Sequence, residues 1–469
     1  MTGYTIRCVI ASLALISASF AEKEVSKSAD DSKDSAQAQE EQRVRPPIDV
    51  QEEVLENGLR VVVINDKCRG AVVFGVLYFV GFGDEPRNVV GISHFVEHMM
   101  FGGTKNLSSA ELKSLLEKYN ASTNAFTTLD ITCYTHYCRK EFLDINLKIE
   151  ADRMQNLLFD EDYINREREV IIEERKMRVE SDPRQKYMVE AAFKILYLYS
   201  TYSYPGIGYV DQIRACDRQA LLTHYNKFYT PNNAAIVFVG DITLKEAAKL
   251  AKQYFGGIQK KGEVKRERII DPKQSELGLT YTMEHASKQI RMHDLDTIYN
   301  LDREWIDTAR KAIIVEIIQN ILSRGEDSIL SQNMVDKKEL VYAIDSYLDI
   351  RAFDKGRYSI SAIMREGKGV KVVKKELAAL LDNVLKLLTP ELFERAKKKI
   401  LDGIEMMEDD PQNVMQWCAL NLGLGYSVAD LRNIKELVTS IKFEEIKAIA
   451  KKIFTKKNRI MQIYSHPDS

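Results

Sequence analysis

Two histidines and a glutamate, His94, Glu97 and His98, occur within five consecutive residues of this 469-residue chain. On a helix, residues four apart share a face, so both imidazoles can reach one metal ion. Neutral imidazole is a good zinc ligand, and a carboxylate beside the ion can take a proton from water and later pass it to a leaving amine. The motif therefore predicts zinc-dependent hydrolysis of peptide bonds. The alternative is a solvated helix face on which these residues coincide by chance.

Zinc in a hydrolase usually has three protein ligands, so a third must come from elsewhere in the chain. Residues 164–180 read INREREVIIEERKMRVE, and their apolar positions predict a helix with one buried strip. Most acids in this segment should pair with neighbouring arginines at three- and four-residue spacings. The pattern alone does not single out one of them as a ligand.

The order His-x-x-Glu-His is the inverzincin signature, and the chain resembles the family of pitrilysin, insulysin and mitochondrial processing peptidase, in particular its short two-domain bacterial members. In that family a glutamate ligand follows the motif by about 76 residues, and counting 76 from His98 gives Glu174. The family also has an acidic residue seven positions earlier, here Glu167, which we expect to orient the site. The resemblance implies one Zn²⁺ per chain, bound by His94, His98 and Glu174, with Glu97 as general base.

A second matching segment is Asn124-Ala125-Phe126, which continues as TTLDITCYTHY and predicts a strand by its alternation. In the family, the corresponding strand is a sheet edge beside the zinc, and an extended substrate pairs with it through main-chain hydrogen bonds. The resemblance therefore makes Asn124, Ala125 and Phe126 substrate-binding residues. An ordinary sheet strand is the alternative.

The composition, 45% hydrophobic and 29% charged, is that of a folded chain long enough to divide into domains. Its 67 basic and 69 acidic residues nearly cancel, so charge gives no reason to expect nucleic acid or an anionic membrane as a partner.

The first 21 residues differ from the rest: Arg7 precedes an apolar run at residues 8–17, and small residues precede the end of this segment at Ala21. We expect a secretory signal, residues 1–21, that is cleaved after Ala21 and directs the protein to a bacterial periplasm. The run is too short to span a bilayer stably, and an uncleaved anchor is the alternative. Residues 22–45 are almost devoid of apolar side chains beyond alanine and valine, which predicts a flexible leader.

Five cysteines remain after removal of the signal, an odd number, so at least one thiol has no intramolecular partner. A disulfide between Cys133 and Cys138 would suit an oxidising compartment. However, residues five apart on a strand face opposite sides, so this bridge would need a bend. A metal site that includes His136 is a further alternative for this stretch.

An internal repeat indicates two related halves. Residues 227–236 are echoed 225 residues later by residues 452–461. At an offset of 222, the three motif residues fall on Glu316, Gln319 and Asn320. The second copy is therefore expected to keep the amphipathic helix and to lack the metal ligands.

The resemblance implies an α+β fold of two homologous α/β domains, each a mixed, largely antiparallel sheet covered by helices, which together form a clamshell. We expect an N-terminal zinc-peptidase domain at residues 46–260, a linker at 261–272 and a C-terminal domain without metal ligands at 273–469.

Members of the family that act alone have an arginine and a tyrosine seven residues apart in the second domain, which bind substrate and help to stabilise the developing oxyanion. Here Tyr342 matches the tyrosine, but Val335 occupies the arginine position. Arg351 and Tyr358 are also seven apart, in a different sequence context. This departure implies that the chain is the zinc-bearing subunit of a heterodimer whose other subunit, a paralogue without the motif, supplies the pair.

The predicted function is that of a zinc endopeptidase acting on extended peptides or unfolded protein segments in the periplasm. A non-catalytic structural or peptide-binding subunit of the same fold is the alternative, and the complete His-x-x-Glu-His motif argues against it.

Overall fold

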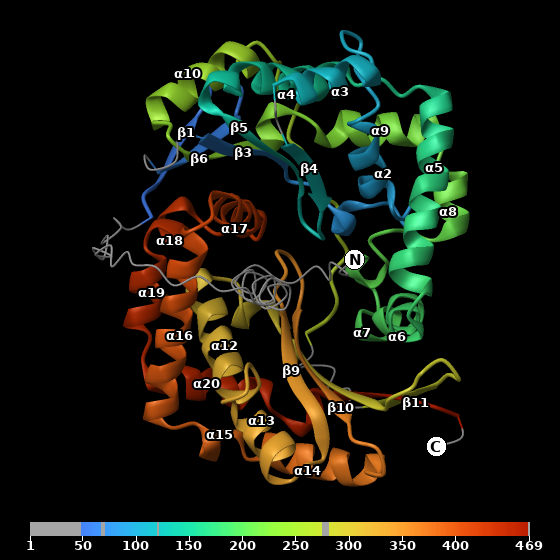
Figure 1. Cartoon of the computed structure of the whole chain (residues 1–469), viewed down its shortest axis with the longest axis vertical. Helices are drawn as coiled ribbons and strands as arrows, with labels where there is room; N and C mark the ends of the chain where they lie inside the picture. Colours follow the sequence, from blue (N-terminus) through green and yellow to red (C-terminus); the bar gives the residue numbers. More distant parts are fainter. Residues whose placement is uncertain (1–47, 67–70, 120–121, 274–280, 468–469) are drawn as a thin grey trace, which may run out of the picture.

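The computed structural model describes residues 48–66, 71–119, 122–273 and 281–467. The predicted signal (1–21) and leader (22–45) lie outside these residues. The described chain forms two lobes that face one another, each built on one open sheet covered by helices (Figure 1). The predicted architecture, two domains with mixed sheets and helical layers, is confirmed.

The first lobe contains a six-stranded sheet in the order β1-β2-β6-β3-β5-β4. Its strands are β1 (Val50–Val54), β2 (Arg60–Asn65), β3 (Ala71–Tyr78), β4 (Ser122–Thr127), β5 (Thr132–Arg139) and β6 (Ala234–Gly240). Only the β2–β6 pair among these is parallel, and the other neighbours are antiparallel. Strand β6 lies inside the sheet and is buried along its whole length, which explains its unbroken apolar sequence AAIVFVG.

The second lobe contains a five-stranded sheet in the order β7-β11-β8-β10-β9. Its strands are β7 (Tyr281–Ala286), β8 (Asp294–Leu301), β9 (Val341–Asp349), β10 (Gly356–Met364) and β11 (Arg459–Ser465). The pair β11–β7 is parallel and the other pairs are antiparallel.

Helices cover both sheets. In the first lobe they are α2 (Ile92–Met99), α3 (Ser109–Lys118), α4 (Leu143–Asn156), α5 (Glu161–Arg175), α8 (Val210–Ala215), α9 (Arg218–Phe228) and α10 (Leu244–Phe255). Helices α6 (Pro183–Tyr187) and α7 (Phe193–Leu196) follow α5 in the chain but pack on the second sheet, in a cluster with Met283, Ile298 and Ile460. In the second lobe they are α12 (Ala309–Leu322), α13 (Ile329–Ser331), α14 (Val370–Asp382), α15 (Val384–Leu387), α16 (Pro390–Glu408), α17 (Pro411–Gly423), α18 (Val428–Arg432), α19 (Ile434–Ser440) and α20 (Phe443–Ile453).

One face of the first sheet packs against its own helices, and the other face meets α17 of the second lobe. The approach of α17 is close at Gly75 of β3, where an added Cβ would lie 2.6 Å from Sδ of Met415. A glycine is therefore needed here for the contact between the lobes.

The internal repeat is visible as repeated structure. Helix α9, a 3₁₀ turn and β6 recur as α20, a 3₁₀ turn and β11, and the bounds of every element are displaced by 225 residues (443 − 218 for the helices). Both copies therefore contain a helix, a 3₁₀ turn and a sheet strand in the same order and with the same lengths.

The second copy of the motif helix differs from the expectation. Helix α12 carries Glu316, Gln319 and Asn320 in place of the motif residues, as the offset predicted, but it is buried on nearly every face. The prediction of an amphipathic helix was wrong because α16 and α20 pack against α12 together with the sheet. A helix enclosed in this way is buried on most of its surface and has no single apolar stripe.

All four cysteines described in the structure, Cys133, Cys138, Cys216 and Cys418, are free and buried. Cys133 faces the core shared with the second lobe and Cys138 faces the helices of the first lobe, because they lie five residues apart on β5. The Cys133–Cys138 disulfide is therefore absent.

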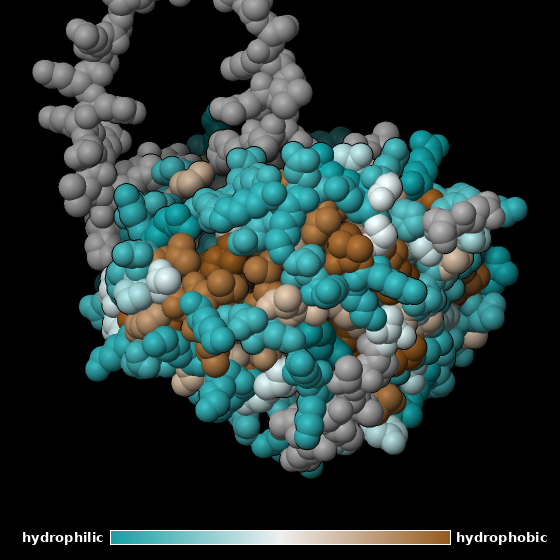
Figure 2. All heavy atoms as spheres, turned by 90° about the horizontal axis from the view of Figure 1, so that it is seen from below, coloured by the Kyte–Doolittle hydropathy of each residue, from teal (hydrophilic) through white to brown (hydrophobic). Residues whose placement is uncertain are grey.

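No helix in the described ranges is both long and apolar enough to cross a bilayer. Figure 2 shows the molecule from below, with apolar side chains gathered in patches on a largely hydrophilic face. Exposed apolar atoms are normal on protein surfaces, and we assign no partner to these patches.

Candidate metal centre

Helix α2 carries the His-x-x-Glu-His motif and is anchored at its N-terminus. It begins after Gly91, whose φ of 96° lies in the region that favours glycine. The buried carboxylate of Glu85 accepts hydrogen bonds from the N–H groups of Gly91 (2.7 Å) and Ser93 (2.8 Å). These N–H groups would otherwise lack a partner within the helix. Burial raises the pKa of Glu85 to about 8, and the hydrogen bonds from Gly91 and Ser93 oppose this rise.

The predicted ligands come together in space. Nε2 of His94 and Nε2 of His98 each lie 3.5 Å from Oε2 of Glu174, which reaches them from α5. Ligand atoms of the three residues all lie within 4.8 Å of one another. Among the described residues, this is the one group of three or more histidine, cysteine, aspartate or glutamate side chains with such spacing.

The donor set fits a zinc ion. Ligand atoms around tetrahedral zinc, at about 2.0–2.1 Å from the metal, are separated by about 3.3 Å. The observed separations of 3.5 Å are close to this value. Two imidazole nitrogens and one carboxylate oxygen are also the set that leaves one position open in catalytic zinc sites.

Charged residues on α5 and on the π-helix that follows it (Lys176–Glu180) hold the ligands in place. Nδ1 of His98 lies 3.1 Å from Oε2 of Glu167, so the second nitrogen of this ring has a partner and Nε2 is directed toward Glu174. The other oxygen of Glu174, Oε1, accepts from Nη2 of Arg178 at 2.7 Å. Glu167 therefore contacts the ring nitrogen of His98 that faces away from Glu174, a contact that can orient a ligand.

The protonation states suit a cation. Burial lowers the pKa of His94 to about 3, which keeps this ring neutral, the form that binds metal. Burial also opposes protonation of His98, but its hydrogen bonds with Glu167 and Glu174 raise its pKa to about 9. Burial would raise the pKa of Glu174, yet His98, His94 and Arg178 lower it to about 2. A divalent cation between the three ligand atoms would take the place of the proton on His98.

Glu97 lies on the same helix, 9% exposed, and Thr127 Oγ1 donates a hydrogen bond to its Oε2 at 2.5 Å. Burial raises the pKa of Glu97 above its ordinary value, and the bond from Thr127 opposes this rise. Thr127 is the last residue of β4, so this contact connects the motif helix to the strand predicted to bind substrate.

Strand β4 is the outermost strand of the first sheet and pairs only with β5 among the described strands. Asn124 is exposed, whereas Ala125 and Phe126 are half-buried against the two cores on either side of the sheet. Residues 124–126 lie on an edge strand, as expected, but the stretch predicted as one strand forms two antiparallel strands, β4 and β5, joined by a turn at residues 128–131. Its free edge has main-chain groups available for pairing with an extended peptide.

The remaining candidate residues lie in the second lobe. Tyr342 lies on β9, also an outermost strand, is 49% exposed and has its ring 5.2 Å from the guanidinium of Arg365. Val335 is half-buried against the core. Arg351 is buried in an ion pair with Asp349 (2.5 Å).

The buried hydroxyl of Tyr358 bonds with Ser323 at 2.5 Å. Arg351 and Tyr358 are thus engaged inside the protein. They do not form an exposed pair.

Three contributors to this centre were missed from the sequence: Glu85, Thr127 and Arg178. Thr127 directly follows the predicted substrate-binding residues 124–126, and this position could have suggested a role. Arg178 lies four residues after Glu174, the spacing of a helical ion pair. Nothing in the local pattern distinguishes Glu85 from other loop acids.

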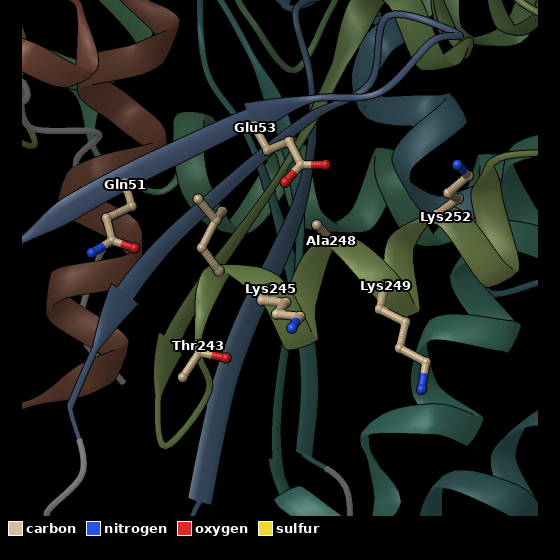
Figure 3. Close-up of a pocket in the computed structure, with 8 residues that line it drawn as sticks. Gln51, Glu53, Thr243, Lys245, Ala248, Lys249 and Lys252 are labelled. Carbon is tan, nitrogen blue, oxygen red and sulfur yellow. The ribbon is translucent and has the colours of Figure 1, made fainter.

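A cleft of about 630 Å³ lies elsewhere, between β1 and α10 (Figure 3). Three lysines of α10, Lys245, Lys249 and Lys252, line it together with Gln51 and Glu53 of β1. None of its lining residues belongs to the metal centre. Lysines spaced along one helix face are typical of a solvated surface, and we assign no ligand to this cleft.

Comparisons with known proteins agree with the geometry. The family description "Insulinase (Peptidase family M16)" matches residues 60–206, and "Peptidase M16 inactive domain" matches residues 215–400. The chain is 27% identical over 343 residues to zinc protease PqqE of Helicobacter pylori, covering 71% of this chain and 74% of that one. It is 24% identical over 406 residues to the uncharacterized zinc protease YmxG of Bacillus subtilis, covering 85% and 94%.

Solved structures share the fold. A protease from Helicobacter pylori superposes with a TM-score of 0.81 at 23% identity, over 90% of this chain and all of that one. The periplasmic protease PqqL of Escherichia coli matches with a TM-score of 0.73 at 18% identity, over 90% of this chain and 48% of that longer one. Two descriptions of one family together span most of residues 60–400, and the relatives contain both lobes. The chain belongs to the insulinase family of peptidases, family M16, and resembles its two-domain bacterial members.

Proposed function

We propose that this chain is a zinc-dependent endopeptidase that hydrolyses extended peptides or unfolded protein segments. The observation that carries the proposal is the convergence of His94, His98 and Glu174 beside Glu97 and at the end of an edge strand. The relatives named as zinc proteases support the choice of metal and reaction.

In this proposal His94, His98 and Glu174 hold one Zn²⁺. When bound, the ion supplies a Lewis acid that polarises a peptide carbonyl and makes water more acidic. Glu97 takes a proton from the attacking water and delivers it to the amine that leaves. Thr127 fixes the orientation of the Glu97 carboxylate for both transfers.

Substrate would add to the sheet at β4. Asn124, Ala125 and Phe126 offer main-chain groups along the free edge, which gives affinity with little dependence on sequence. A peptide that follows β4 away from Thr127 would pass Ser122, which is paired with Tyr137 of β5. Tyr137 lines a cleft of about 460 Å³ between the lobes, opposite Met406 and the turn before α17. We expect this cleft to receive a side chain of long substrates.

A partner subunit is also part of the proposal. Tyr342 is exposed, but the position seven residues before it holds Val335, so the cationic donor found in self-sufficient members is missing there. Removing one oxyanion donor typically costs about 10² to 10³ in turnover. The isolated chain should therefore hydrolyse peptides slowly, and a paralogue without the motif should restore the rate as a heterodimer.

One variant and the unmodified chain test the need for a partner. Val335→Arg should raise its turnover if one chain can form the whole site. Full turnover by a pure monomer or homodimer of the unmodified chain would contradict the partnership.

A bacterial periplasm is the proposed location, supported by the signal-like residues 1–21 and by the periplasmic relative PqqL. Amino-terminal sequencing of the fractionated protein should find a chain that starts at or near Glu22. A membrane-retained chain that still carries Cys8 would contradict the proposal.

The alternative is a non-catalytic subunit, favoured by the match of residues 215–400 to a domain described as inactive. One pair of substitutions separates the two functions. Glu97→Gln should keep zinc stoichiometric and reduce cleavage of a quenched peptide by several orders of magnitude, because it preserves shape and removes the proton acceptor. Glu174→Gln should instead lower the zinc content. Cleavage at the wild-type rate by the Glu97→Gln protein would exclude Glu97 as the base.

A further inference from the structure

The segment that connects the lobes carries two arginines that are tied to the first lobe. Residues 261–272 form neither helix nor strand, yet the side chain of Arg268 is only 3% exposed and that of Arg266 only 13%. Both guanidiniums donate to the fully buried carboxylate of Asp84, at distances of 2.7–2.9 Å. Burial would raise the pKa of Asp84, but Arg268 and Arg266 lower it below its ordinary value. This ion cluster is therefore charged and strongly held.

A first chain of contacts runs from this cluster to the N-terminus of α2. Oδ2 of Asp84 also accepts the N–H of Gly81 at 3.0 Å, and Gly81 O accepts from Ser93 Oγ at 3.1 Å. The residue after Asp84 is Glu85, whose carboxylate accepts the N–H groups of Gly91 and Ser93. The position of Asp84 thus fixes the group that anchors the motif helix.

A second chain of contacts runs to Glu97. Arg268 Nη1 donates to Asp130 Oδ1 at 2.5 Å, and Arg266 Nη2 donates to Asp130 O at 2.7 Å. Asp130 lies in the turn between β4 and β5, three residues after Thr127, which donates to Glu97. The same two arginines therefore hold α2 from two sides, through its N-terminus and through its glutamate.

The second lobe contacts the same cluster. Asp130 Oδ2 accepts the N–H of Ala352 at 3.3 Å. The ring of Phe353 lies 4.2 Å from the guanidinium of Arg268 and 4.8 Å from that of Arg266. A change in the orientation of the lobes would disturb these contacts, and so would reach the loops that position Glu97.

We propose that Arg266 and Arg268 are positioning residues for Glu97 and Thr127, and that Phe353 makes their geometry depend on the orientation of the second lobe. This inference rests on the proposed peptidase function. It also predicts a property of the folded protein that does not require activity: the amides of α2 and of residues 122–131 should be protected from exchange by the arginine cluster.

The test uses the full-length, zinc-loaded chain, and its partner if one is found. Arg268→Ala removes the donor, and Arg268→Lys keeps the charge but not the forked geometry. Phe353→Ala removes the ring contact with the second lobe and keeps both arginines. Arg310→Ala is the matched control, because Arg310 also makes a forked pair, with Glu445 at 2.8 and 3.0 Å, but lies on α12. Zinc content, hydrogen exchange, and kcat and KM on a quenched peptide are measured for each.

We expect Arg268→Ala to lower kcat by about 10², the loss expected when a group in the active site is displaced by about 1 Å. KM and zinc content should stay within about twofold of the wild-type values. Arg268→Lys should recover part of the loss, and Phe353→Ala should lower kcat by about tenfold with intact zinc. Exchange should rise in α2 and residues 122–131 in these variants and stay unchanged there in Arg310→Ala.

If Arg268→Ala does not fold, Arg268→Lys and Phe353→Ala decide the question by the same measurements. Unchanged exchange in α2 and residues 122–131, or losses of the same kind in Arg310→Ala, would overturn the proposal. If wild-type protein cleaves no peptide under any condition, the proposed function fails, and the exchange data still decide whether the cluster positions the helix.

Discussion

Replacing Glu316 with glutamine should change how the stability of the second lobe depends on pH. Glu316 stands at the position that corresponds to His94 in the first copy and is 1% exposed. Neither of its carboxylate oxygens has a hydrogen-bond partner among the described residues, and Arg324 is 3.6 Å away. Burial raises the pKa of Glu316 from 4.5 to about 8, while Arg324 opposes this rise.

The direction in which stability changes with pH follows from the number of protons that the folded and unfolded chains bind. Between pH 4.5 and about 8 the unfolded chain has lost this proton and the folded chain has kept it, so stability falls as pH rises. Each pH unit is worth about 1.4 kcal/mol, so the loss accumulates to roughly 5 kcal/mol across this range. Glutamine keeps the shape of the side chain and does not ionise, so Glu316→Gln should equal wild type near pH 5 and exceed it by several kcal/mol at pH 8.

Denaturant unfolding of wild type and Glu316→Gln at pH 5, 6, 7 and 8, with hydrogen exchange of α12 as a local probe, measures the difference. Glu444→Gln is the control, because Glu444 has an 81% exposed side chain in the same lobe and should leave the wild-type slope unchanged. Parallel stability curves for wild type and Glu316→Gln would refute the argument that a carboxyl without a hydrogen-bond partner is buried in α12.

Further predictions concern the support of the metal centre and the contact between the lobes. Glu85→Ala should lower the zinc affinity and speed hydrogen exchange in α2, because two N–H groups lose their acceptor at a cost of about 1–3 kcal/mol. Competition for zinc with a chelator would measure the change in affinity. Arg178→Ala should weaken zinc binding by about 10 to 100 fold, since it releases one oxygen of Glu174, and an unchanged affinity would show that Arg178 is dispensable. Gly75→Val should destabilise the packing of α17 on β3 and lower the melting temperature, with a smaller effect when Met415→Ala is added.

The sequence predicted the parts of the centre that depend on local spacing and on the resemblance. His94, Glu97 and His98 share one helix, so their geometry follows from periodicity. Glu174 could be chosen among many acids only by comparison with the family, because its contact with the histidines spans more than 70 residues of chain. The structure brings these residues to the distances that a metal requires.

The sequence could not predict contacts that depend on tertiary packing. Helix α12 is buried on most of its surface because two other helices enclose it, which periodicity does not reveal. Arg351 and Tyr358 have the spacing of a substrate-binding pair but are buried in contacts of their own. The sequence also did not predict the contacts of Arg266 and Arg268, because a charged, glycine-containing segment normally indicates a solvated linker.

The most direct test of the central claim is the metal content of the purified chain. After treatment with a chelator and exposure to excess Zn²⁺, followed by removal of unbound metal, the wild-type and Glu97→Gln proteins should each hold one zinc per chain, while His98→Ala and Glu174→Gln should hold much less. Peptide cleavage by wild type, alone or with its partner, should disappear with the chelator and return with zinc. A folded wild-type chain that retains no zinc above the level of His98→Ala would contradict the assignment of this centre.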